Sequence, residues 1–249
     1  MTATLYIVGT GPGDAELLTL KALNILTSCP VIISPRGSLN GTSTALDIVS
    51  QVVNIAGKDV HELHFPMKKI RIGHDPDPEI LVAWRHAAET VLHYIDQGKD
   101  VCFPTLGDPA IYSTGYYLFE TICGIRPEID TVFIPGISAM SSCSAALATP
   151  ICLGDEMVAV IPATFSDERI KEVLTRFDTV ILMKVHRVLD RLCVLLTECD
   201  LVEQAILVER AGMKDEKVFR RIDQITSQPH YFSTIIIRKN LSSVRVLMN

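Results

Sequence analysis

The sequence has no apolar run that approaches the roughly 20 residues of a membrane-spanning helix. Its N-terminus lacks the basic and then apolar pattern of a signal peptide. An excess of positive charge is also missing, since 23 Lys and Arg stand against 29 Asp and Glu, for a net charge of −6. These absences argue against a membrane protein and against a broad nucleic-acid-binding surface. We therefore expect a cytoplasmic protein whose 249 residues form one large or two small domains.

Patterns typical of metal sites and disulfide frameworks are missing too. The seven cysteines show no C-x-x-C spacing, and several lie within apolar stretches, as buried thiols do. His61 and His64 fall in a segment that reads as extended, where alternation sends residues three apart to opposite faces. His86 and His93 share one helical stripe, but no Cys or carboxylate joins them at ligand spacing. We predict no metal site, and we interpret all four histidines as structural or surface residues.

The most informative segment present is a glycine-rich loop near the N-terminus. It runs Gly9-Thr10-Gly11-Pro12-Gly13-Asp14, between an apolar strand and an apolar-periodic run. Glycines let a ligand approach the backbone closely, as in dinucleotide-binding folds. Here Pro12 lacks an N–H, and Asp14 and Glu16 place carboxylates where a pyrophosphate needs amide donors. We therefore expect no phosphate cradle, and we interpret Asp14 as a helix N-cap beside a glycine-lined wall.

Strand and helix patterns alternate along the chain. Predicted strands cover residues 4–8, 31–34, 60–65, 100–105, 131–134, 156–161, 179–184, 204–208, 217–221 and 233–238. Predicted helices cover residues 15–27, 43–53, 79–97, 111–123, 137–147, 166–176 and 187–198. This order predicts an α/β fold with a parallel sheet covered by helices. Because the alternation restarts after Gly124 and Pro127, we expect domains at 1–124 and 125–249, with the cleft between them as the default site.

Three more small-residue loops follow predicted strands. They are Leu106-Gly107-Asp108-Pro109, Pro135-Gly136-Ile137-Ser138-Ala139 and Glu209-Arg210-Ala211-Gly212. Ligands of open parallel sheets sit beyond the carboxyl ends of strands, where these loops lie. Asp108 either accepts a hydrogen bond from a ligand or caps the next helix, with Pro109 in its first turn. Four such loops at four strand ends together indicate a binding site.

The glycine loop and the first two of these segments, in this order, resemble the signature blocks of the tetrapyrrole (corrin/porphyrin) methylases. The resemblance spans nearly the whole chain. Shorter strings resemble the precorrin-2 C20-methyltransferase branch of cobalamin synthesis. These strings are Ser34-Pro35-Arg36, Phe65-Pro66-Met67, Leu106-Gly107-Asp108-Pro109-Ala110-Ile111-Tyr112-Ser113-Thr114 and Gly154-Asp155-Glu156.

The family resemblance implies two α/β domains, the first with a mostly parallel sheet and the second with a mixed sheet, and an active site in the cleft between them. It also implies a homodimer and S-adenosyl-L-methionine as methyl donor, with S-adenosyl-L-homocysteine as product. The positions that match family cofactor contacts are Pro12, Leu106, Gly107, Asp108, Ile111, Ser138, Ala139, Met183, Lys184, Ala211 and Thr234.

The implied substrate is precorrin-2 or its cobalt complex, a reduced macrocycle with many carboxylates. Its electron-rich meso carbon acts as the nucleophile, so no strong base is required. Asp14 and Tyr112 are the candidate catalytic residues, for proton removal and for orienting the ring. Cationic side chains and the glycine loop suit the carboxylates. The candidates for binding the substrate are Gly11, Gly13, Arg36, Lys68, Lys69 and Arg71.

Other functions stay open at this stage. A nicotinamide-dependent dehydrogenase would need an acidic residue after the second strand, where Ser34-Pro35-Arg36 stands. Family relatives that methylate another tetrapyrrole, a protein or ribosomal RNA keep the cofactor and change the acceptor. The acidic net charge argues against RNA. A ligand-binding module without turnover would bind the cofactor and transfer no methyl group.

Overall fold

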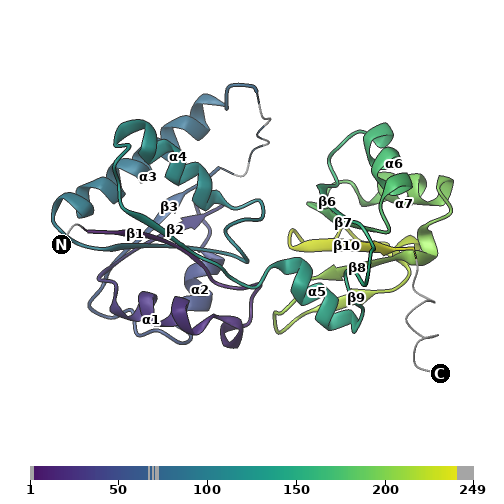
Figure 1. Ribbon diagram of the computed structural model, residues 1–249, viewed down its shortest axis with the longest axis horizontal. Helices are drawn as coiled ribbons and strands as arrows, with labels where there is room; N and C mark the ends of the chain where they lie inside the picture. Colours follow the sequence, from purple (N-terminus) through teal and green to yellow (C-terminus); the bar gives the residue numbers. More distant parts are fainter. Residues whose placement is uncertain (1–2, 67, 69, 71–72, 240–249) are drawn as a thin grey trace. The chain divides into compact units, whose positions relative to one another are not determined.

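The computed structural model describes residues 3–66, 68, 70 and 73–239 (Figure 1). The chain divides into two compact units, Met1–Ser138 and Ala139–Asn249. Each unit is built around its own sheet of five strands. Among the helices of the described residues, none has the length and apolar character needed to cross a membrane.

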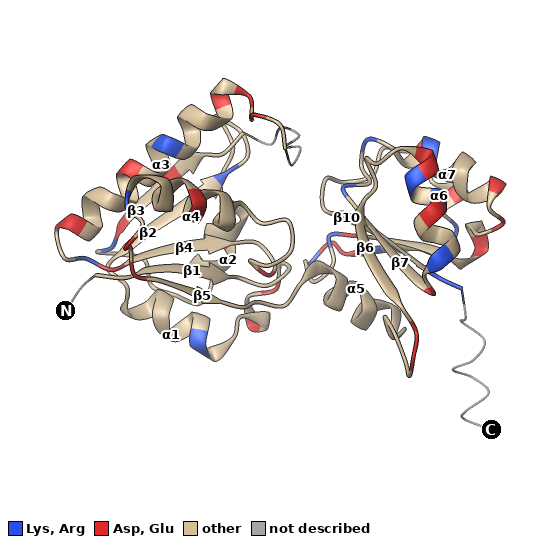
Figure 2. Ribbon diagram, turned by 45° about the horizontal axis from the view of Figure 1, so that its top comes forward, with Lys and Arg blue, Asp and Glu red and all other residues tan. Residues whose placement is uncertain are grey.

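The sheet of the first unit is entirely parallel. Its strands are β1 (Leu5–Gly9), β2 (Val31–Arg36), β3 (Asp59–His64), β4 (Val101–Thr105) and β5 (Thr131–Ile134). They lie in the order β3-β2-β4-β1-β5. Strands β1, β4 and β5 carry no charged residue (Figure 2). Such apolar strands suit a parallel sheet that is covered on both faces.

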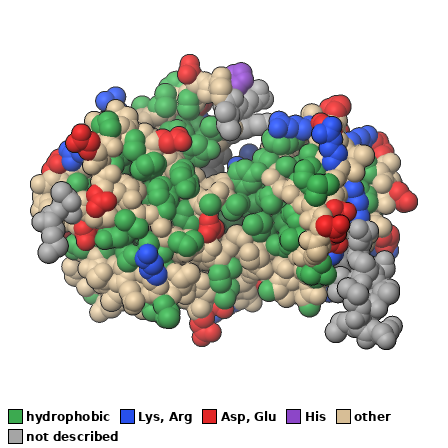
Figure 3. All heavy atoms as spheres, viewed as in Figure 1, with side chains coloured by type: hydrophobic (Ala, Val, Ile, Leu, Met, Phe, Trp, Pro, Cys, Tyr) green, Lys and Arg blue, Asp and Glu red, His purple; other side chains and the backbone are tan. Residues whose placement is uncertain are grey.

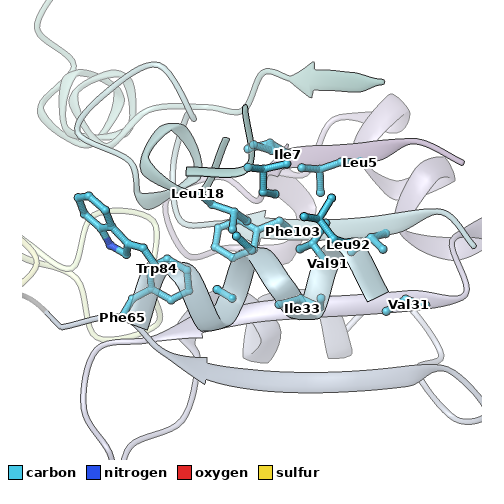
Figure 4. Close-up of a cluster of buried hydrophobic side chains, with 14 of the residues drawn as sticks. Leu5, Ile7, Val31, Ile33, Phe65, Trp84, Val91, Leu92, Phe103 and Leu118 are labelled. Atoms are coloured by element: carbon cyan, nitrogen blue, oxygen red, sulfur yellow. The ribbon is translucent and has the colours of Figure 1, made fainter. Parts of the chain in front are cut away.

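Helices cover both faces of this sheet. Helices α1 (Leu20–Ser28) and α2 (Thr44–Ser50) pack on one face, and α3 (Pro78–Asp96) and α4 (Thr114–Ile125) pack on the other (Figure 1). Residues of α3 at helical spacing, including Trp84, Val91 and Leu92, meet Ile33 and Phe103 of the sheet (Figure 4). The predicted apolar face of this helix is therefore core.

The second unit has a mixed sheet. Its strands are β6 (Val158–Pro162), β7 (Thr179–Met183), β8 (Ala205–Glu209), β9 (Lys217–Phe219) and β10 (Ser233–Arg238), in the order β6-β7-β10-β8-β9. Strand β10 is antiparallel to β7 and to β8, so these two run in the same direction. Helix α5 (Ala139–Leu147) packs on one face, and α6 (Asp167–Arg176) and α7 (Leu189–Glu198) pack on the other. The remaining helical segments are the short 3-10 turns η1 (Ala15–Leu17), η2 (Val202–Gln204) and η3 (Ile222–Gln224).

The predicted domain boundary near residue 124 lies too early. The compact units divide between Ser138 and Ala139, because β5 pairs with β1 and completes the first sheet. An apolar strand that follows a helix carries no local mark of the sheet it joins. The sequence pattern therefore identifies β5 and assigns it to the wrong unit.

Four predicted helices begin at least two residues later than expected, and α7 is one of them, since it begins at Leu189 rather than at 187. The predicted helix 15–27 is split into η1 and α1, because Leu18 is extended and Thr19 caps a new helix through Ala22 N. Helix α4 begins at Thr114 rather than at 111, since Tyr112 adopts a left-handed backbone conformation (φ 50°). Helix α5 begins at Ala139 rather than at 137.

Candidate functional site

Three loops converge at the carboxyl ends of adjacent strands β4, β1 and β5. We call residues 10–14 loop 1, residues 106–113 loop 2 and residues 135–138 loop 3. Gly11 of loop 1 and Gly107 of loop 2 exchange backbone hydrogen bonds, with N to O distances of 3.2 and 2.7 Å. Thr10 N donates to Thr105 O at 2.9 Å. Loops 1 and 2 are therefore fixed to each other by their backbones.

Glycine is required in these loops for two separate reasons. A Cβ on Gly9 would lie 2.7 Å from Gly136 N and 2.8 Å from Gly107 O, and a Cβ on Gly136 would collide with the same carbonyl. Gly11 and Gly107 instead have left-handed φ values of 75° and 74°. Because the three strand ends approach so closely, no side chain fits between them. The surface beside loops 1 to 3 is therefore formed by backbone atoms.

The two aspartates of these loops make different contacts. Asp14 is exposed and accepts a hydrogen bond from Glu16 N at 2.9 Å, which confirms the predicted cap, although it caps η1 rather than an α-helix. Asp108 accepts from Ala110 N at 2.7 Å and from Gly136 N at 3.0 Å. The helix after loop 2 is capped by Ser113, so the interpretation of Asp108 as its cap is wrong.

The rest of loop 2 is shaped around Tyr112. Its φ of 50° is strained for a residue with a bulky side chain. Ser113 Oγ lies 3.0 Å from Thr105 Oγ1 and accepts from Gly115 N, which fixes the chain immediately after it. Burial raises the pKa of the Tyr112 phenol above its ordinary value. Leu106 and Ile111 are half-buried on the same loop, and Pro12 of loop 1 is buried.

Arg36 is the last residue of strand β2, so it lies at the same end of the sheet as the three loops. Strand β2 pairs with β4 through Ile32 and Cys102, so Arg36 and Leu106 each follow a paired residue by four positions. The Nε of Arg36 is buried and makes no hydrogen bond with the described residues. A guanidinium with an unused buried donor suits a carboxylate ligand.

Of the other predicted cationic residues, Lys68 is described by the structure and is already paired. Lys68 is engaged in ion pairs with Asp77, at 3.0 Å, and with Glu79, at 2.5 Å. Hydrogen bonds to these two carboxylates raise its pKa. Lys69 and Arg71 lie outside the described residues.

In the second unit, the residues predicted to contact the cofactor lie at one end of the sheet, where strands β7 and β8 finish and β10 begins. Thr234 pairs in register with Met183 of β7 and with Val208 of β8, three residues before Ala211. Met183 and Ala211 belong to the apolar cluster beneath α5, the helix that Ala139 opens directly after the buried Ser138. Lys184 follows Met183 with a left-handed φ of 63°. Burial lowers its pKa.

The sequence reasoning missed polar residues at this same end of the sheet. The rings of His186 and Tyr231 make an edge contact with centroids 4.9 Å apart. Arg210, with φ 53°, pairs through Nε with Asp215 at 2.5 Å and lies 3.2 Å from His230 Nε2. Burial, followed by the charge of Arg187, lowers the pKa of His186 and favours its neutral form. Among these residues, only Arg210 could have been found from the sequence, because it belongs to one of the small-residue loops. The loops that carry His186 and His230 have no glycine pattern.

The described part of the chain holds no group of three His, Cys, Asp or Glu side chains placed to bind a metal ion. His61 instead lies 2.7 Å from the Tyr94 hydroxyl, measured from Nε2. The seven cysteines are free thiols.

Comparison with known proteins gives the family. The family model for tetrapyrrole (corrin/porphyrin) methylases matches residues 4–225. The cobalt-precorrin-2 C(20)-methyltransferase of Salmonella typhimurium is 31% identical over 96% of this chain and 98% of its own. A protein of Methanocaldococcus jannaschii named probable cobalt-precorrin-2 C(20)-methyltransferase is 34% identical over 94% of this chain and 96% of its own.

A solved structure agrees at the level of the fold. The uroporphyrin-III C-methyl transferase of Thermus thermophilus, complexed with S-adenyl homocysteine, superimposes with a TM-score of 0.67. It covers 98% of this chain and 94% of its own, at 20% sequence identity. With a family model that spans nine-tenths of the sequence and relatives aligned along their whole length, the chain belongs to the tetrapyrrole (corrin/porphyrin) methylases.

Proposed function

We propose that this protein is an S-adenosyl-L-methionine-dependent methyltransferase that acts at C20 of precorrin-2 or cobalt-precorrin-2 in cobalamin biosynthesis. The observation that carries the proposal is the end-to-end similarity, at 31% and 34% identity, to two proteins named for this reaction. The alternative is another member of the family with a different corrinoid, porphyrinoid, protein or RNA acceptor. No feature of the described residues favours that alternative over the first.

The three loops suit S-adenosyl-L-methionine better than a dinucleotide. Pro12 offers no N–H, and the carboxylates of Asp14 and Glu16 stand at the start of η1, where they would repel a phosphate. The same carboxylates are compatible with a cofactor that carries a positive sulfonium. Arg36 stands where a dinucleotide-binding fold has the acidic residue for the ribose.

We propose two sets of cofactor contacts, one from each unit. The first set is Pro12, Leu106, Gly107, Ile111 and Ser138, on the three loops; Asp108 stands among them with both carboxylate oxygens bonded to backbone N–H groups. The second set is Ala139, Met183, Lys184, Ala211 and Thr234, at the start of α5 and along the strand ends of the second sheet. The first set is supported by the backbone bonds between loops 1 and 2, and the second by the register of β7, β10 and β8.

When bound, the cofactor supplies an electrophilic methyl group, whose transfer to the macrocycle carbon removes the sulfonium charge. The chain contributes alignment and exclusion of water, which suffice for an in-line displacement onto an electron-rich carbon. Tyr112 is a hydrogen-bond donor in this scheme, because a tyrosine phenol is protonated at neutral pH and burial raises its pKa further. Asp14 is the better candidate to accept a proton after methylation, since it is exposed and uses one oxygen for its cap.

The substrate carboxylates are proposed to bind Arg36 first, with Gly11 and Gly13 offering backbone. Arg36 has a buried Nε without a hydrogen-bond partner among the described residues, whereas Lys68 is already held by two carboxylates. Lys69 and Arg71 remain candidates from the sequence alone. The arrangement would serve metal-free and cobalt-containing rings alike, because both carry the same carboxylates.

A homodimer and a cytoplasmic location complete the proposal. The family resemblance suggests the dimer, and exposed apolar residues on α3 and α4 give it a candidate surface: Leu81, Val82, Tyr116 and Ile125. Hydrophobic side chains gather on the visible face of the first unit (Figure 3). Sedimentation equilibrium of the purified protein tests the dimer, and a monomer at micromolar concentration would contradict it.

The activity is tested by mass spectrometry of anaerobic reactions that contain the protein, S-adenosyl-L-methionine and either precorrin-2 or cobalt-precorrin-2. We expect a product that is one methyl group heavier from at least one of the two, and the faster substrate identifies the natural one. Protein that binds the cofactor and methylates neither ring would contradict the proposed acceptor.

A further inference from the structure

Asp108 uses both carboxylate oxygens on backbone N–H groups. Oδ1 accepts from Ala110 N at 2.7 Å, within loop 2, and Oδ2 accepts from Gly136 N at 3.0 Å, 28 residues away in loop 3. The first bond turns the chain after Pro109. The second bond joins two loops that follow different strands of the sheet.

The place of this second bond in loop 3 is specific. Pro135 has no N–H, so Gly136 offers the first donor after strand β5 ends at Ile134. Gly136 is also the residue whose backbone meets Gly9 and Gly107 too closely for any side chain. The carboxylate therefore holds loop 3 at the point of closest backbone approach.

A carboxylate is needed for both bonds together. It is an acceptor at each oxygen, whereas an amide side chain of the same shape has one acceptor and one donor group. Asparagine could satisfy Ala110 N or Gly136 N and would turn its NH₂ group toward the other. Hydrogen bonds to a charged acceptor are also stronger than those to a neutral one.

We infer that Asp108 is a positioning residue for the cofactor site, which acts through the backbone of loop 3 and not by direct contact with the ligand. The inference rests on the proposed function. Holding Gly136 fixes the two residues that lead to Ser138, and thereby the last loop contact of the first unit. The loss of this bond is expected to loosen loop 3 while the sheet beneath it stays intact.

The test is the substitution Asp108→Asn in the full chain, with two readouts. Amide exchange at Gly136, followed by mass spectrometry or NMR, is expected to accelerate roughly 10-fold or more. The dissociation constant for S-adenosyl-L-homocysteine, measured by calorimetry, is expected to rise roughly 10- to 100-fold, the size expected for a charge-assisted hydrogen bond. If Asp108→Asn fails to fold, Asp108→Glu keeps the charge, displaces it by one methylene, and is measured in the same way.

Asp100→Asn is the matched control. Asp100 Oδ1 accepts from Thr4 N at 2.8 Å, which is also a long-range bond to backbone, at the opposite end of strands β1 and β4. This control is expected to lower the melting temperature without changing Gly136 exchange or ligand affinity. An equal loss of affinity in both variants would show a general loss of stability and would overturn the inference.

The outcomes separate the possible roles of Asp108. Weakened binding with unchanged amide exchange at Gly136 would indicate that Asp108 contacts the ligand directly. Faster exchange with unchanged affinity would show that the bond from Gly136 N to Asp108, the clamp, does not serve the cofactor site. Either result overturns the inference. If the wild-type protein does not bind the ligand at all, the proposed function fails, whereas the exchange at Gly136 still reports on the clamp.

Discussion

At the scale of single residues, the candidate site is built mainly by residues without side chains. Gly9 and Gly136 are required by contact distance, and Gly11 and Gly107 by backbone conformation. The sequence pattern could show that the loops are rich in glycine. It could not show which glycines touch, because those contacts join residues that are 29 to 127 positions apart in the sequence.

Gly136→Ala is expected to destabilise the protein by about 1 to 3 kcal/mol or more, because the new Cβ would meet Gly107 O and the backbone of Gly9. Binding of S-adenosyl-L-homocysteine should weaken as well. Urea denaturation and calorimetry measure the two effects. Gly124→Ala is the control: it places a methyl group in open space near the end of α4 and should be neutral or stabilising by up to about 1 kcal/mol. Equal behaviour of the two variants would contradict the contact.

Arg36→Met is expected to raise KM for the macrocycle about 10- to 100-fold with little change in kcat, because charge-assisted bonds to a carboxylate are lost. Lys68→Met should raise KM much less, since Lys68 is already paired with Asp77 and Glu79. Steady-state kinetics with varied substrate concentration measure both variants. A larger increase in KM for Lys68→Met than for Arg36→Met would show that Lys68, and not Arg36, makes the main contact with the substrate carboxylates.

The thiols should differ strongly in reactivity. Burial raises the pKa of Cys143 to about 12, so at pH 8 almost no thiolate forms there. Cys152 is exposed. Iodoacetamide is expected to modify Cys152 in the folded protein and Cys143 only after denaturation, as read from peptide masses. Early modification of Cys143 would contradict its burial beneath α5.

At the scale of elements, periodicity predicted most of the secondary structure. The helix from Pro78 to Asp96 was expected at 79–97, because its apolar residues recur at helical spacing. The starts of α1 and α4 were misplaced for local reasons, a second cap at Thr19 and the left-handed Tyr112. The bond from Asp108 to Gly136 could not be predicted, because it depends on the adjacency of two loops.

One string of the branch resemblance has a structural use. Glu156, between α5 and β6, accepts two hydrogen bonds from Arg238, at 2.8 and 2.7 Å, and one from Leu153 N at 2.7 Å. The Arg238 side chain is only 2% exposed and ends strand β10. This ion pair joins the connection before β6 to the far end of β10.

Glu156→Ala is therefore expected to lower the free energy of unfolding by about 3 to 5 kcal/mol, because it leaves Arg238 buried without its partner. Lys171→Ala removes the exposed pair with Glu198 and should cost at most about 1 kcal/mol. Urea denaturation compares the variants. A loss below 1 kcal/mol for Glu156→Ala would show that the pair is solvated.

At the scale of the whole molecule, the two-unit α/β architecture was predicted, with a parallel sheet first and a mixed sheet second. The boundary was not, since β5 returns to the edge of the first sheet beside β1. Its return creates the third loop next to the first. The placement of this strand therefore decides how many loops the first unit brings together.

The most direct test of the proposed function is to determine which atom receives the transferred methyl group. The protein would be incubated with S-adenosyl-L-methionine labelled with ¹³C in its methyl group and with the ring that it methylates faster. NMR of the product is expected to show one labelled methyl group, attached to the meso carbon C20. A label at another carbon, or on the protein, would contradict the proposed reaction and would assign the site to a different acceptor.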